Sequence, residues 1–104
     1  MSRRRSYRIE YTNEAVEQLG ELTARQRATL LDSVERQLAH QTTVATRNRK
    51  LLRANPVAPW ELRIGAMRVY FDVVEVPSAV VTVRAVGVKV RERVRIGGVE
   101  VDLG

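Results

Sequence analysis

Two arginines, Arg63 and Arg68, flank a predicted two-residue turn at Gly65-Ala66. Apolar and polar residues alternate on both sides of the turn, which predicts a β-hairpin with one buried face. Counting outward from the turn places Arg63 opposite Arg68, with Cβ atoms about 5 Å apart. Two guanidinium groups at that spacing can bind a phosphate between them. The alternative is that an acidic neighbour, Glu61 or Asp72, balances their charge.

The same count defines both faces of the hairpin. A glycine at the first central position of the turn is typical of type II′. The predicted cross-strand pairs are Ile64 with Met67, Arg63 with Arg68, Leu62 with Val69, and Glu61 with Tyr70. The face opposite the core then carries Glu61, Arg63, Arg68, Tyr70 and Asp72.

A second basic group follows a predicted central strand at 80–88. It consists of Lys89, Arg91, Arg93 and Arg95. Alternating positive charge can protect a sheet edge against pairing with another chain. The same residues can also present charge to the hairpin from the end of a central strand. The sequence leaves both readings open.

The amino-acid composition excludes several kinds of site and favours certain partners. The 104 residues include no cysteine and one histidine, which excludes cysteine-based zinc sites, thiol nucleophiles and disulfides. Aromatic residues make up 5%, too few for a broad base-stacking platform. The net charge is +6 and the pI about 10.7, values that favour a nucleic-acid partner or an acidic protein partner. Most of the excess charge lies in Arg3-Arg4-Arg5 and in 47–53.

The remaining elements are those of one small domain over 1–104, with a basic terminus at 1–5. Tyr7, Ile9 and Tyr11 alternate with polar residues and predict a strand. Two helices should follow. The first begins near Thr12 or Asn13 and carries an apolar stripe of Ala15, Val16, Leu19 and Leu22. The second begins with a capping box at 23–26 and buries Leu30 or Leu31, Val34 and Leu38.

Periodicity is absent between Gln41 and Pro59. A small final hairpin is predicted around Gly97-Gly98. The expected fold is therefore α+β, with an N-terminal strand and a two-helix hairpin packed on a twisted, mainly antiparallel sheet of four to five strands.

The run from Pro59 to Val73 resembles the central hairpin of the RelE/ParE toxin superfamily. The shared pattern is an aromatic residue, Glu-Leu-Arg-Ile, a turn, and then Arg-Val-aromatic-aromatic-Asp. The segment from Ala85 to Lys89 is similar to the last core strand of that family. The resemblance covers nearly the whole chain in order. Within the superfamily, the RelE-like branch is the one that the hairpin resembles most.

The resemblance implies the toxin of a type II toxin–antitoxin pair that cuts messenger RNA in the ribosomal A site. It implies a cytoplasmic protein whose partners are an acidic antitoxin that folds on binding, the ribosome and messenger RNA. We expect no cofactor, metal, membrane or small-molecule ligand. The catalytic residues expected are Arg63, Arg68, Lys89, Arg91, Glu61 and Tyr70. The residues expected to bind RNA or the ribosome are Arg3, Arg4, Arg5, Arg47, Arg49, Lys50, Arg53, Arg93 and Arg95.

Two positions depart from the family's pattern. Its most active ribonucleases have a lysine where Glu61 stands and a tyrosine in an acid/base role where Arg95 stands. Arginine does not exchange protons near neutral pH, so Tyr70 or Glu61 is expected to take over proton transfer. The alternatives are a ParE-like inhibitor of DNA gyrase and a catalytically degraded toxin that survives as a binding protein.

Overall fold

The computed structural model describes residues 6–39 and 45–101, and it has the expected α+β architecture. The elements are β1 (Arg8–Tyr11), α1 (Asn13–Gly20), α2 (Ala24–Leu38), β2 (Arg49–Leu51), β3 (Trp60–Ile64), β4 (Met67–Val74), β5 (Val80–Val90), β6 (Arg93–Ile96) and β7 (Val99–Val101). The predictions for Arg3, Arg4 and Arg5 fall outside the described residues.

The sheet has seven strands in the order β2-β3-β4-β5-β6-β7, and β1 pairs in parallel with the first part of β5. All the other pairs are antiparallel. The sheet is thus larger than the four to five strands expected, because β2 forms in the segment without periodicity and the final hairpin adds two strands. A three-residue strand is too short to produce a pattern, and β2 is defined by its pairing with β3.

Local signals fix both helices as predicted. Thr12 caps α1 by accepting a hydrogen bond from the backbone N–H of Ala15 at 3.1 Å. Thr23 and Gln26 form the reciprocal capping box of α2. Val16 is a correction to the predicted stripe: it is 55% exposed, because it lies to one side of the face that Ala15 and Leu19 bury.

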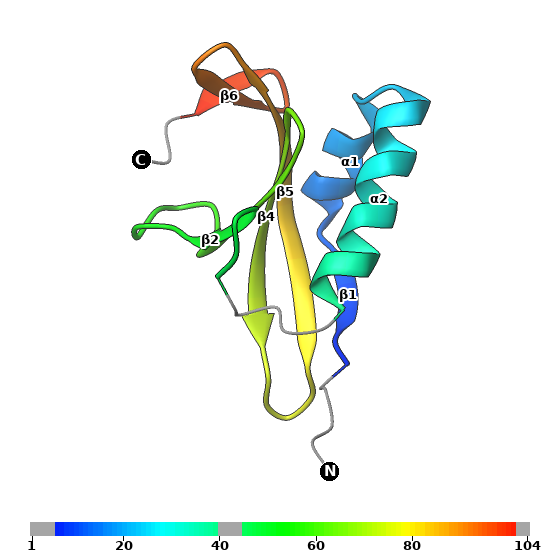
Figure 1. Ribbon diagram of the computed structural model, residues 1–104, viewed down its shortest axis with the longest axis vertical. Coiled ribbons are helices and arrows are strands. Elements are labelled where there is room, and N and C mark those ends of the chain that lie inside the picture. The colour runs from blue at the N-terminus through cyan, green and yellow to red at the C-terminus, as the bar shows by residue number, and fades with distance from the viewer. Residues whose placement is uncertain (1–5, 40–44, 102–104) are drawn as a thin grey trace.

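Both helices cover one face of the sheet, whereas β2 and the β6–β7 hairpin lie toward the other side (Figure 1). The apolar core fills the space between the helices and the first face. Its fully buried members are Ala15, Leu30, Val34, Leu38, Leu62, Val69, Phe71, Val81 and Val83. Trp60 stacks on Phe71 with ring centroids 6.1 Å apart, and it packs against the core.

The hairpin register is the predicted one, with Arg63 opposite Arg68 and Glu61 opposite Tyr70. Gly65 has φ 58° and Ala66 is not left-handed, as a type II′ turn requires. Gly97 and Gly98 both have positive φ in the predicted final turn. The strand over 80–90 is central, since it pairs with β4 on one edge and with β1 and β6 on the other.

One residue of β5 has no partner on β4. Tyr70 pairs with Ala85 and Phe71 pairs with Val83, so Arg84 forms a β-bulge. Val81 and Val83 face the helices, and without the bulge the alternation would place residues 85, 87 and 89 on that face too. The extra residue reverses the alternation, so Lys89 faces the side away from the helices.

Gly87 of β5 pairs with Ile96 of β6, and the two strands lie close together at this position. A Cβ atom at this position would stand 2.6 Å from the carbonyl oxygen of Arg95 and 2.9 Å from a side-chain carbon of Ile96. The absence of a side chain therefore lets β6 approach the strand that carries Lys89.

We expect Gly87→Ala to lower the free energy of unfolding by about 1–3 kcal/mol, because the added methyl group meets backbone that must move. Gly20→Ala is the matched control: nothing lies within 4 Å of its Cβ position at the end of α1. The control should be neutral or stabilising by up to about 1 kcal/mol. Urea unfolding measures both, and equal effects of the two substitutions would contradict this account.

Candidate active site

The face of the sheet away from the helices holds a small cleft of about 140 Å³. Strands from β2 to β7 and the turn after β5 contribute its walls. The lining residues are Lys50, Leu52, Glu61, Arg63, Arg68, Tyr70, Lys89, Glu92, Val94 and Val101. Five of the six residues expected to be catalytic therefore come together, and Lys50 joins them from β2.

Glu61 is the buried anion of the cleft, with 6% of its surface exposed. Its Oε1 lies 3.4 Å from Nε of Arg63 and 4.0 Å from Nζ of Lys50. Lys50 faces Glu61 directly across the β2–β3 pair. Of the two acidic neighbours considered from the sequence, Glu61 is the one that meets an arginine of the hairpin. Asp72 pairs with Arg84 at 3.3 Å instead.

Arg68 is held differently from Arg63. It is buried, and its Nη1 donates to the carbonyl oxygens of Gly65 at 2.7 Å and Met67 at 2.9 Å. These contacts fix the guanidinium group at the turn. Within 6–39 and 45–101, no carboxylate forms an ion pair with Arg68. A positive charge held in place without an anion is suited to binding a phosphate oxygen.

Tyr70 lies at the floor of the cleft and is fully buried. Its hydroxyl makes no hydrogen bond of ordinary geometry within the described part of the chain, although the Glu61 carboxylate is close enough to act on it. Burial raises the pKa of Tyr70 above its ordinary value of 10, and Glu61 raises it further. Burial and Glu61 therefore keep the phenol neutral, and the part of Tyr70 in proton transfer stays a prediction.

Lys89 is the last basic member of the cleft. It is half-buried, and its backbone N–H donates to the carbonyl oxygen of Ala66 at 2.7 Å, which ties it to the hairpin turn. In register it faces Val94 of β6, which also lines the cleft. The bulge at Arg84 and the hairpin turn thus bring Lys89 and Arg68 to one wall.

The other three arginines of the second basic group do not join the cleft. Arg93 and Arg95 pair with Val90 and Val88, so they lie on the opposite face of the sheet, and Arg91 lines the hollow on that side. The sequence placed Arg91 among the catalytic residues, which the strand geometry does not support. It also aligned Arg95 with the family's acid/base tyrosine, and this position faces away from the cleft.

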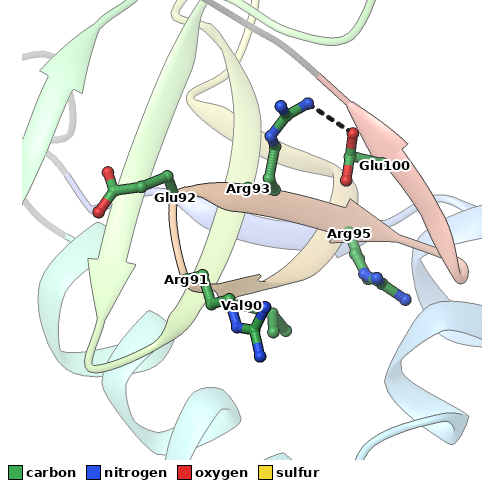
Figure 2. A pocket seen from close by; sticks show the side chains of 6 residues that line it. All are labelled: Val90, Arg91, Glu92, Arg93, Arg95 and Glu100. Carbon is green, nitrogen blue, oxygen red and sulfur yellow. Dashed lines mark hydrogen bonds and ion pairs between the residues drawn. The ribbon is translucent and has the colours of Figure 1, made fainter.

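Figure 2 shows the opposite hollow, of about 650 Å³, at the end of β5. Arg93 turns toward Glu100, with Nη1 and Oε2 2.7 Å apart, and Arg91 and Arg95 turn away from this pair. The hollow shares only the turn residue Glu92 with the cleft.

The basic residues of the stretch 47–53 also point to different places. Arg47 and Arg53 are exposed, and Lys50 reaches the cleft. Arg49 is a correction to the predicted RNA-binding surface, because it is 8% exposed and burial lowers its pKa. It lies opposite Leu62, on the core side of β2.

The arrangement can bind a phosphate group and remove a proton from a hydroxyl next to it. Arg63, Arg68, Lys50 and Lys89 supply positive charge, and Glu61 is a carboxylate among them. No cluster of three or more side chains that commonly bind metals forms within the described ranges. In the same ranges, no helix is long and apolar enough to cross a membrane.

The structure is similar to a chain of the RelBE2 toxin–antitoxin complex from Mycobacterium tuberculosis. The TM-score is 0.71 at 20% sequence identity, and the alignment covers 82% of this chain and 93% of that chain. This chain has a RelE-like fold. The fold implied by the sequence resemblance is thereby confirmed. A scan against protein-family models and a search of curated proteins find no match.

The buried tyrosines predict how stability changes at high pH. Burial, together with Glu35, raises the pKa of Tyr11 to about 12, and the pKa of Tyr70 is also raised. Folding therefore favours their neutral forms, so their contribution to stability is present below pH 10. It is lost as the pH rises from 10 through the folded-state values.

We expect Tyr70→Phe to flatten this decline, because phenylalanine has no proton to lose. Urea unfolding between pH 8 and 11.5 measures the effect, with Tyr7→Phe as the control at a less buried tyrosine. A decline in Tyr70→Phe as steep as in the unchanged protein would contradict the assignment.

Proposed function

We propose that this chain is the toxin of a type II toxin–antitoxin pair and that it cleaves messenger RNA on the ribosome. The observation that carries the proposal is the cleft, which is lined by four basic side chains and one buried carboxylate. The RelE-like fold, shared with a chain of a toxin–antitoxin complex, supports the toxin role and an antitoxin partner.

The proposed reaction is attack of a ribose 2′-hydroxyl on the adjacent phosphate. The 2′-oxygen bonds to phosphorus, the bond to the 5′-oxygen breaks, and the products end in a cyclic phosphate and a free 5′-hydroxyl. The step needs a base for the 2′-hydroxyl, an acid for the leaving oxygen and positive charge on the phosphate.

The cleft offers a group for each of these needs. Glu61 accepts the proton of the 2′-hydroxyl, because it is the buried carboxylate of the cleft and lies beside Arg63 and Lys50. Arg68, its cross-strand neighbour Arg63 and Lys89 bind the non-bridging oxygens. The ammonium groups of Lys50 and Lys89 are the proton donors available to the leaving 5′-oxygen.

Lys50, the second basic residue near Glu61, matters because the Glu61 position departs from the family's pattern. A lysine stands at the Glu61 position in the family's most active ribonucleases. Here Lys50 supplies an ammonium group from the neighbouring strand, 4.0 Å from the Glu61 carboxylate. The cleft therefore has a lysine near the Glu61 position, supplied by β2, and a carboxylate at that position itself.

We expect Glu61→Gln to reduce cleavage by about 10²–10⁴-fold, the usual contribution of a general base. The measurement is single-turnover cleavage of messenger RNA on purified ribosomes with a defined codon in the A site. Glu92→Gln is the matched control, because Glu92 lies at the exposed rim of the same cleft. The control should cleave at the unchanged rate.

Undiminished cleavage by Glu61→Gln would remove Glu61 from the reaction. Unchanged circular dichroism of the variant shows that a loss of cleavage is not a loss of fold.

A gyrase-inhibiting toxin is the second candidate, and the orientation of Arg95 favours it. That position holds the acid/base tyrosine in the family's ribonucleases, and here it lies on the far face. A gyrase inhibitor needs no proton transfer. Inhibition of DNA supercoiling by both the unchanged protein and Glu61→Gln, with messenger RNA left intact, would establish this candidate instead.

A further inference from the structure

We propose that Gln18 is a positioning residue for the cleft, because its side chain holds β5 in the bulged register that brings Lys89 there. Gln18 belongs to α1 and is not among the residues that line the cleft. Its Oε1 accepts a hydrogen bond from the backbone N–H of Val86 at 2.8 Å, across 68 residues of sequence. The effect on the sheet is inferred from these contacts alone, whereas the effect on cleavage rests on the proposed function.

The Gln18 contact fills a gap along one edge of β5. In the register, β1 pairs with β5 as far as Val83, and β6 begins to pair at the residue after Val86. Between these strands, side chains of the α1 segment take the place of a strand. The hydroxyl of Thr12 donates to the carbonyl oxygen of Arg84 at 3.2 Å, and Gln18 accepts from the buried Val86. Buried backbone groups need partners of this kind.

The directions of the backbone groups show that the Gln18 bond belongs to the bulged register. Before the bulge, odd-numbered residues direct their backbone toward β1, since the carbonyl oxygens of Ala79 and Val83 accept hydrogen bonds from that segment. After the bulge, the even-numbered Val86 donates to Gln18, while Lys89 donates to the hairpin turn on the β4 side. In a strand without the bulge, the N–H of the residue before Val86 would face Gln18 instead. The amide of Gln18 therefore favours the register that turns Lys89 away from the helices.

Gln18 also lies against the final hairpin. A Cβ atom at Gly97 would stand 3.9 Å from Cγ of Gln18 and 4.0 Å from its Nε2. Gly97 lies in the turn between β6 and β7, and Val94 and Val101 of these two strands line the cleft. One half-buried side chain thus connects α1, the bulged strand and the hairpin beside the cleft.

Lys89 is the residue through which Gln18 reaches the reaction. In the proposed function, Lys89 binds a non-bridging oxygen and is one of two ammonium groups available to the leaving oxygen. A strand that loses the bulge would turn Lys89 toward the helices. Gln18 therefore affects cleavage without touching the substrate.

The lysines of the chain provide a probe that does not depend on activity, because Lys50 and Lys89 are the only two. Reductive methylation with 13C-formaldehyde labels both side-chain amines and keeps their charge. NMR of the full chain then gives one methyl signal for each lysine. Lys50→Arg and Lys89→Arg each remove one signal and so assign the spectrum.

We expect Gln18→Leu to shift or split the Lys89 signal and to leave the Lys50 signal in place. Leucine removes the acceptor oxygen, whereas Gln18→Glu retains an acceptor and should keep both signals in place. Glu17→Leu is the matched control, since Glu17 is the exposed neighbour on the same helix, and it should move neither signal. A loss of stability alone would not distinguish the two lysines.

Single-turnover cleavage on ribosomes provides the second readout. Gln18→Leu should lower the cleavage rate about tenfold, and it should lower the rate no further in a Lys89→Met background, because the two residues act together. Additive losses in the double variant would overturn the proposal, since Gln18 would then act by another route.

The unchanged protein supplies a test that holds even if Gln18→Leu fails to fold. A scalar coupling between the backbone nitrogen of Val86 and the side-chain carbonyl carbon of Gln18 passes through the hydrogen bond, and its absence would overturn the proposal. A Lys89 signal that stays in place in folded Gln18→Leu, or that moves equally in Glu17→Leu, would also overturn it. If the unchanged protein does not cleave messenger RNA, the proposed function fails, and the lysine signals still decide this inference.

Discussion

Arg84 is the one residue of the β4–β5 pairing that has no partner in the register, and it determines which side chains of the long central strand reach the cleft. Val81 and Val83 before it face the helices, and so does Val86 after it. The bulge reverses the alternation of β5, which keeps the strand apolar toward the core over its whole length. The same reversal places Gly87 and Lys89 on the other face. Lys89 then stands near Arg68, and Gly87 leaves room for β6.

The two faces of the sheet consequently have different roles, one in the core and the other in the cleft. The helix side is filled by apolar side chains and provides the stability of the domain. The other side brings Lys50, Arg63 and Arg68 into one cleft with the buried carboxylate of Glu61. Like charges in close proximity cost stability unless an anion is present. Glu61 supplies one anion, and the proposed function supplies the other as the phosphate of the substrate.

The hairpin could be predicted from the sequence because a two-residue turn fixes its register. The positions of Arg63, Arg68 and Tyr70 followed by counting. The bulge could not be predicted, because Arg84 in a valine-rich strand fits ordinary alternation equally well. Without the bulge, neither the side on which Lys89 lies nor the separation of Arg95 from the cleft could be derived. The role of Lys50 depended on β2, which is too short to show a pattern.

We have proposed that the cleft cleaves messenger RNA during translation. Primer extension on cellular messages, within minutes of inducing the protein from a tightly controlled promoter, tests it most directly. The account predicts cuts at codon-phased positions that disappear when translation initiation is blocked. Growth arrest with intact messages and relaxed or damaged DNA would contradict it.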